Sequence, residues 1–207
     1  MHDSDAVVPA EADTDPPLVR RRQAVWRCYR DDRAAAGAAL AAKAREEFGD
    51  HGELWYAEAC CLERVGRFID ADQAFRRANR AGRFPIALPC RVSWRRFQRA
   101  VDAAIAALPD PLRDAFAETT LVLADYAEPS LLADAEEPEL FGLFEGPVRS
   151  ERDHGGISPR IHLWRRAHEH GCGSVRELDA EVRQTLWHEL GHYLGYDEDE
   201  LDALGRG

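Results

Sequence analysis

The residues with the clearest chemical potential stand near the end of the sequence, where His188, Glu189 and His192 form an H-E-x-x-H pattern. An α-helix repeats every 3.6 residues, so two histidines four positions apart share one face and can direct ring nitrogens at a single ion. Glu189 is the next residue around the helix, where a carboxylate can accept a proton from a metal-bound water. The pattern therefore predicts a zinc site with a general base beside it.

The helix that carries this pattern is defined at both ends by its own sequence. Ser174 and Glu177 form a capping box for the first turn, and Gly195 can adopt the left-handed conformation that ends a helix. Trp187 and Tyr193 widen an apolar stripe in which a residue recurs every four positions: Leu178, Val182, Leu186, Leu190 and Leu194. This wide apolar surface indicates a helix that is buried in a core.

Two histidines require a further ligand, because catalytic zinc usually takes three protein ligands and one water. The segment after His192 is short, so we expect the third ligand to be one of the acids that directly follow the helix, or else a residue upstream such as a histidine. Glu198 is the best placed, since His192-x-x-Gly195-x-x-Glu198 has the spacing of metalloproteases whose chain turns at the glycine and offers a third ligand. Asp197, Asp199 and Glu200 are the alternatives, and the methionine turn of that class is absent.

The second half of the chain resembles the small bacterial zincin-like metallopeptidases with an H-E-x-x-H-x-x-G-x-x-[DE] signature. Besides the motif, the matching segments are 94–109, 140–146, 160–165 and 181–187. The resemblance implies a minimal zincin fold in which His188, His192 and Glu198 bind zinc and Glu189 is the base. It also implies that 161–164 is an edge strand available to an extended substrate. Members often have histidine where this chain has Tyr193.

Composition restricts the classes of partner and the compartment. The net charge of -11 argues against a general nucleic-acid binder and favours cationic or neutral partners. Five cysteines without a C-x-x-C pair indicate neither a disulfide framework nor a thiolate zinc site. No stretch approaches the roughly twenty apolar residues of a membrane span, and the N-terminus does not resemble a signal peptide. We therefore expect a cytoplasmic protein that binds no membrane.

The first half of the chain is predicted to be helical after an acidic start. Residues 1–18 combine acids and prolines and are expected to form a disordered tail. Within 19–84, tetratricopeptide-repeat positions are occupied by Trp55, Ala59, Leu62, Gly66, Phe68, Ala71, Phe75 and Ala78. We expect a TPR-like module of about four helices that can recruit a protein partner. The alternative is a generic helical hairpin that serves as a lid on the second domain. The arginines at 76, 77, 80 and 83 indicate a solvated helix end.

The prolines of 85–92 predict a linker, after which 93–207 form an α+β domain. This domain is expected to contain a helix that ends before Pro109, a strand within 119–126, a long loop from Gly142 to Pro159 and the strand at 161–164. His168 and His170 are interpreted as exposed loop residues.

The sequence as a whole therefore predicts an α+β metallopeptidase that uses Zn²⁺ to hydrolyse peptide or protein substrates. Tyr193, Tyr196 and His162 are the candidates for stabilising the oxyanion. The competing hypothesis is a non-catalytic adaptor, with a structural zinc site and a helical module that binds a partner. A third possibility is a regulatory protease that acts on one target recruited by that module.

Overall fold

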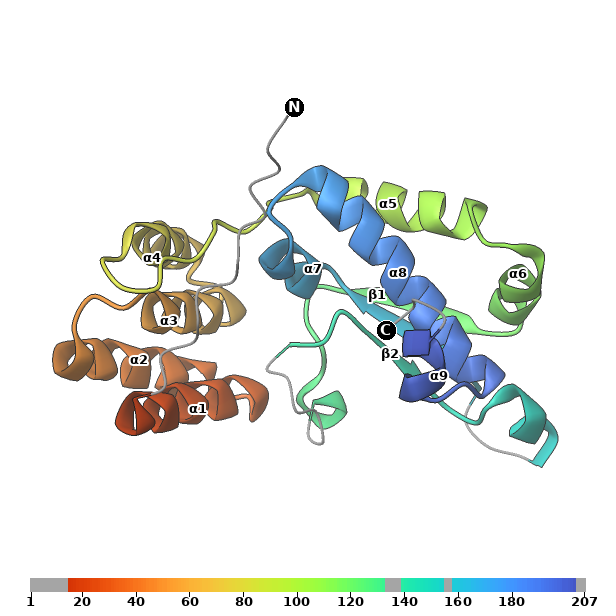
Figure 1. The fold of residues 1–207 in the computed structure, drawn as a ribbon, viewed down its shortest axis with the longest axis horizontal. Helices are drawn as coiled ribbons and strands as arrows, with labels where there is room; N and C mark the ends of the chain where they lie inside the picture. Colours follow the sequence, from red (N-terminus) through yellow and green to blue (C-terminus); the bar gives the residue numbers. More distant parts are fainter. Residues whose placement is uncertain (1–14, 133–138, 155–157, 204–207) are drawn as a thin grey trace. The chain divides into compact units, whose positions relative to one another are not determined.

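The computed structural model describes residues 15–132, 139–154 and 158–203 (Figure 1). The chain forms two compact units, Met1–Leu88 and Pro89–Gly207, which divide within the expected linker. The first unit is helical and the second combines helices with a small sheet, so the predicted α+β class is confirmed. The finer domain limits and the TPR-like character of the first unit stay predictions.

Four helices make up the described part of the first unit: α1 (Pro16–Arg30), α2 (Ala34–Phe48), α3 (Gly52–Arg64) and α4 (Phe68–Arg80). Each helix packs against the next along the chain. Small residues permit this close packing: Ala41, Ala57 and Ala71 are fully buried, and a Cβ atom at Gly37 would lie 2.7 Å from the Cys61 sulfur. The first helix begins within the stretch expected to be a tail, at a proline, which suits the first turn of a helix.

The second unit places three strands among its helices. Its elements are α5 (Trp94–Ala106), α6 (Asp110–Ala117), β1 (Thr120–Ala124), η1 (Pro129–Leu131), β2 (Gly142–Glu145), η2 (Arg149–His154), β3 (Arg160–Trp164), α7 (Arg165–Gly171), α8 (Val175–Leu194) and α9 (Glu198–Ala203). The strand order is β1-β3-β2, with β3 parallel to β1 and antiparallel to β2.

This strand order corrects two expectations. The segment 161–164, expected at an edge, belongs to the central strand β3, and all four of its residues are buried, as is typical of a strand covered on both faces. The expected loop at 142–145 is the edge strand β2. A strand of four residues that begins with glycine carries little strand propensity of its own, so its sequence alone did not reveal it.

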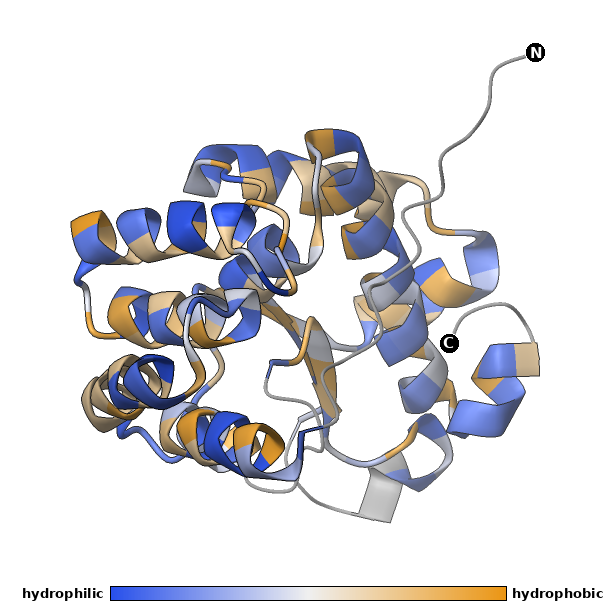
Figure 2. Ribbon diagram, turned by 60° about the vertical axis from the view of Figure 1, so that its left-hand side comes forward, coloured by the Kyte–Doolittle hydropathy of each residue, from blue (hydrophilic) through white to orange (hydrophobic). Residues whose placement is uncertain are grey.

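The main core of the second unit lies between the sheet and two helices. Ile161 and Leu163 of β3 pack with α5 and α8 residues, among them Phe97, Val182 and Leu186. Trp164 points to the opposite face, where it joins a smaller cluster with Leu132 and others. Figure 2 shows the apolar character of the sheet, and Figure 1 shows α8 crossing it. This packing fixes the helix that carries the H-E-x-x-H pattern.

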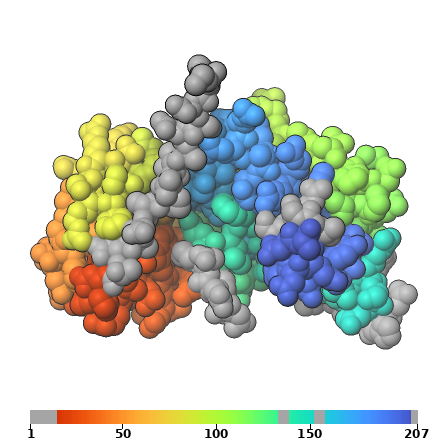
Figure 3. Space-filling view, viewed as in Figure 1, coloured from red at the N-terminus to blue at the C-terminus, as the bar shows by residue number. Residues whose placement is uncertain are grey.

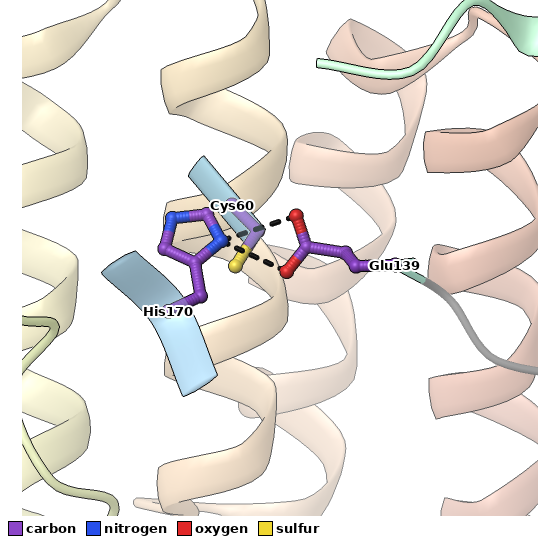
Figure 4. Close-up of side chains that lie close together, drawn as sticks. All are labelled: Cys60, Glu139 and His170. Atoms are coloured by element: carbon purple, nitrogen blue, oxygen red, sulfur yellow. Dashed lines mark hydrogen bonds and ion pairs between the residues drawn. The ribbon is translucent and has the colours of Figure 1, made fainter. Parts of the chain in front are cut away.

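The expectation that His168 and His170 are exposed loop residues is wrong, because both lie on α7. The side chain of His168 is 0% exposed and lies between the rings of Phe97 and Phe141. Its Nδ1–H donates to the Trp164 carbonyl oxygen at 2.7 Å, which satisfies a polar group inside the core. His170 Nδ1 lies 2.8 Å from a Glu139 carboxylate oxygen (Figure 4). The fold supplies these partners, so the prediction from the sequence, which assumed that polar histidines are exposed, did not include them.

Acidification should destabilise the second unit through His168. Burial lowers the pKa of this imidazole from 6.5 to about 4. Between these pH values the unfolded chain binds the proton more readily, so the free energy of unfolding falls as the pH drops from 6.5 toward 4, by about 3 kcal/mol in full. Urea unfolding at pH 7 and pH 5 should show wild type losing about 2 kcal/mol more than His168→Gln. An equal loss in both proteins would contradict this assignment.

Candidate metal centre

Helix α8 begins and ends at the residues that its sequence predicts. The Ser174 side chain accepts the Glu177 N–H at 3.2 Å, and the Glu177 carboxylate accepts the Gly173 N–H at 2.8 Å. At the other end Gly195 has a φ of 98°, the left-handed conformation, and the Tyr196 N–H donates to the Gly191 carbonyl oxygen at 3.1 Å. The two motif histidines therefore occupy the last two turns of a well-defined helix.

The edge strand β2 approaches this helix very closely. A Cβ atom at Gly142 would lie 2.6 Å from Thr185 Cγ2 and 3.1 Å from Glu189 Cγ, so only glycine fits between strand and helix without displacing one of them. Glu189 consequently lies against β2, where its carboxylate accepts a hydrogen bond from the backbone N–H of Phe144.

His188, His192 and Glu198 converge on one point. Nε2 of His188 and Nε2 of His192 are 2.9 Å apart. The Glu198 carboxylate lies 3.6 Å from His188 Nε2 through one oxygen and 3.2 Å from His192 Nε2 through the other. Each of the three residues therefore offers one possible ligand atom, and these three atoms lie within 4.8 Å of one another. The structure thus brings together the three residues that the sequence nominates as metal ligands.

The short helix α9 brings Glu198 to this position. Asp197 and Glu200 cap it reciprocally, since each carboxylate accepts the backbone N–H of the other residue, at 2.9 and 3.0 Å. Leu201, only 2% exposed, rests on α8 where a Cβ atom at Gly191 would lie 2.5 Å from its Cδ2. Figure 3 shows α9 in deep blue at the surface of the second unit.

This arrangement narrows the choice of third ligand. The carboxylates of Asp197 and Glu200 are engaged in capping α9. Upstream, His162 and His168 hold other partners, and no group of clustered ligand atoms within the described residues joins either of them to the motif histidines. Asp199 is also outside the group of converging ligand atoms, so Glu198 is, among the described acids of this segment, the one whose position suits a shared ion.

The part of the chain that contains these ligands is similar to a known protein family. Residues 116–207 match the family model of the zincin-like metallopeptidases.

The zincin-like match starts at the end of α6 and includes the whole sheet and the three candidate ligands. It leaves α1 to α5 unmatched, so it carries no information on the helical first unit. No curated protein matched the chain. Among the residues that the structure describes, no helix combines the length and apolarity needed to cross a bilayer.

Within this zincin-like segment, Glu189 has the electrostatic character of a base. Its side chain is 6% exposed, and burial raises the pKa of the carboxyl to about 7, against the opposing effects of His188 and the Phe144 N–H. A carboxyl with a pKa near neutrality exchanges protons efficiently at physiological pH.

A second set of contacts orients His192. Its Nδ1 lies 3.1 Å from the backbone oxygen of Tyr196, an acceptor, so Nδ1 carries the proton and Nε2 faces His188 and Glu198. Metal-bound histidines commonly donate their other ring N–H in this way, which fixes the tautomer that leaves Nε2 free to bind.

The structure directs two of the three oxyanion candidates, Tyr193 and His162, away from the converging ligand atoms. The Tyr193 hydroxyl donates to Glu118 at 2.7 Å, and Arg149 binds the same carboxylate. His162 Nε2 lies 3.1 Å from Glu145, on a residue that alternates with the core-facing Ile161 and Leu163 and so points to the opposite face of the sheet. Tyr196 is the remaining candidate.

Sequence reasoning missed the supporting residues Gly142, Phe144 and Leu201. Their roles depend on contacts between segments far apart along the chain. The one local signal was Gly191 inside the motif, because a glycine within a helix often has a packing reason, such as the close approach of another element.

Proposed function

We propose that this chain is a zinc-dependent metallopeptidase in which His188, His192 and Glu198 hold the ion and Glu189 is the general base. The observation that carries the proposal is the convergence of two imidazole nitrogens and a carboxylate beside a buried carboxyl of raised pKa. The match of residues 116–207 to the zincin-like family model also supports it.

The donor set fits zinc. Histidine nitrogen and carboxylate oxygen bind zinc at about 2 Å, and ligands at tetrahedral angles are then about 3.3 Å apart. The two imidazole nitrogens are 2.9 Å apart, and each lies 3.2 or 3.6 Å from a different oxygen of the Glu198 carboxylate, so the donors are near the spacing that an ion requires.

The number of ligands favours catalysis over a structural role. Structural zinc sites are usually closed by four protein ligands, whereas catalytic sites keep one position for water. Three ligand atoms gather here among the residues that the structure describes, which leaves one position open.

The chain's own residues then supply the proton transfers. A bound zinc ion would contribute a Lewis acid that lowers the pKa of a water to about 7 and polarises the carbonyl of the scissile bond. Glu189 accepts the proton of the attacking water at its carboxylate and returns it to the leaving amine. The Phe144 N–H holds that carboxylate in place, and the Tyr196 carbonyl holds the His192 ring.

Two measurements on the purified full chain test the proposal together. Elemental analysis should find one zinc ion per chain after equilibration with zinc, and mass spectrometry of a peptide library should show cleavage. A chelator should abolish cleavage and added zinc should restore it. Failure to take up zinc would overturn the proposal, while stoichiometric zinc without cleavage of any peptide would favour the adaptor hypothesis.

A further inference from the structure

Helix α4 presents a cluster of arginines on the exposed side of the first unit. Arg76, Arg77 and Arg80 line a cavity of about 380 Å³ together with Gln73 and Asp50. Neither the Arg76 guanidinium nor the Arg80 guanidinium forms a hydrogen bond or an ion pair with any residue in the described ranges. Three arginines against the single carboxylate of Asp50 give this cavity a net positive charge, in a chain whose net charge is -11.

Asp50, the acid that lines this cavity, offsets part of the charge of Arg77, and both of its oxygens already accept hydrogen bonds from other groups. Asp50 Oδ1 accepts the indole N–H of Trp55 at 2.8 Å, and Oδ2 accepts the Gly82 N–H at 3.1 Å. Because arginines three or four positions apart on a helix repel one another, an anion bound here would relieve an unfavourable interaction and gain charge-assisted hydrogen bonds.

A second cavity of about 430 Å³ continues this surface, since Gln73 and Arg77 line both. Its wall on α2 consists of small side chains: Ala35, Ala38, Ala39 and Ala42. The charges nearby are paired, as Arg45 lies 3.3 Å over the Trp55 ring and binds Glu58, and Arg67 binds Asp70. We call the two cavities together the arginine groove. One end has a wall of alanines and charges that are paired with each other, and the other end is basic.

We propose that the arginine groove docks an acidic peptide segment of a partner protein, with its carboxylates at Arg76, Arg77 and Arg80 and small side chains against the α2 alanines. A peptide fits better than a nucleic acid for two reasons. The alanine wall offers no aromatic platform for bases, and Arg45 already covers the Trp55 ring. The net charge of the chain also repels a long polyanion. The groove lies wholly in the first unit, so this proposal is independent of the metal centre.

Fluorescence anisotropy on the full chain provides the test, with a short labelled peptide of alternating Glu and Ala as the probe and a Lys–Ala peptide of the same length for comparison. We expect saturable binding of the acidic peptide alone, weakened by added salt. The double variant Arg76→Glu/Arg80→Glu should raise the Kd by about tenfold or more, since charge reversal replaces attraction with repulsion. Ala39→Trp, which fills the groove without changing charge, should also weaken binding.

The matched control is Arg20→Glu/Arg27→Glu on α1, which changes the net charge equally at two exposed arginines outside both cavities. Its Kd should stay close to that of wild type. Circular dichroism confirms that each variant is folded. The proposal is overturned if the acidic peptide does not bind, if the control weakens binding as much as the α4 variant, or if single-stranded DNA of equal charge competes as well as the peptide.

Discussion

Glu189→Gln should lower the rate of peptide hydrolysis by about 10²- to 10⁴-fold while zinc content stays that of wild type. The amide keeps the size of the carboxyl and can still accept the Phe144 N–H, but it cannot take a proton from water. Glu189 is absent from the group of converging ligand atoms, so its replacement should leave the ion in place.

Glu181→Gln is the matched control for this prediction. Glu181 lies two turns earlier on α8, and burial raises the pKa of its carboxyl as well. Its replacement should leave both zinc content and hydrolysis unchanged. Wild-type hydrolysis in Glu189→Gln would remove the proposed mechanism, and loss of zinc from that variant would make Glu189 a ligand rather than a base.

Glu198→Ala is expected to act in the opposite order, on the metal first. Removing a charged ligand should weaken zinc binding by more than the 10- to 100-fold that is typical of losing a residue which only supports a ligand. Hydrolysis should then fall because the ion is lost, and excess zinc should restore part of it. Competition with a chromophoric chelator measures the affinity directly.

Asp199→Ala removes the same charge one residue further along α9 and should leave zinc affinity close to that of wild type. Leu201→Ala tests the placement of Glu198 by α9, because Leu201 itself is not a metal ligand. Because Leu201 holds α9 against Gly191, its loss should weaken zinc binding by about 10- to 100-fold, and it should have no further effect when Glu198 is already alanine. Weak zinc binding in Asp199→Ala with normal binding in Glu198→Ala would transfer the third position to Asp199.

Local chemistry made part of this site predictable from the sequence. The limits of α8 follow from Ser174 and Gly195, whose cap and turn depend on a few neighbouring residues. The pairing of His188 with His192 follows from helical periodicity alone. Spacing ranked Glu198 first as the third ligand but left three neighbouring acids and an upstream histidine as alternatives, because the contact of Leu201 with Gly191 and the capping of α9 exist only in three dimensions.

The errors arose where non-local contacts decide the structure. Strand order depends on pairing between segments separated by loops, so the apolar run of β3 could not show that two neighbours flank it. Strand β2 forms although it begins with Gly142, and the same glycine allows α8 to approach. His168 is buried because Phe97 and Phe141, which lie far from it along the chain, pack against its ring. None of these partners is marked by residue type.

The contact of α9 with Gly191 links the docking of this helix to the binding of a metal ion. Glu198 lies beside the histidines with Leu201 docked on Gly191, so an ion that binds all three ligands should favour the docked helix, and docking should strengthen ion binding by the same factor. Zinc should therefore slow amide hydrogen exchange in α9 more than in the distant α5. Because of this reciprocity, the rate of amide hydrogen exchange in α9 should depend on the concentration of available zinc.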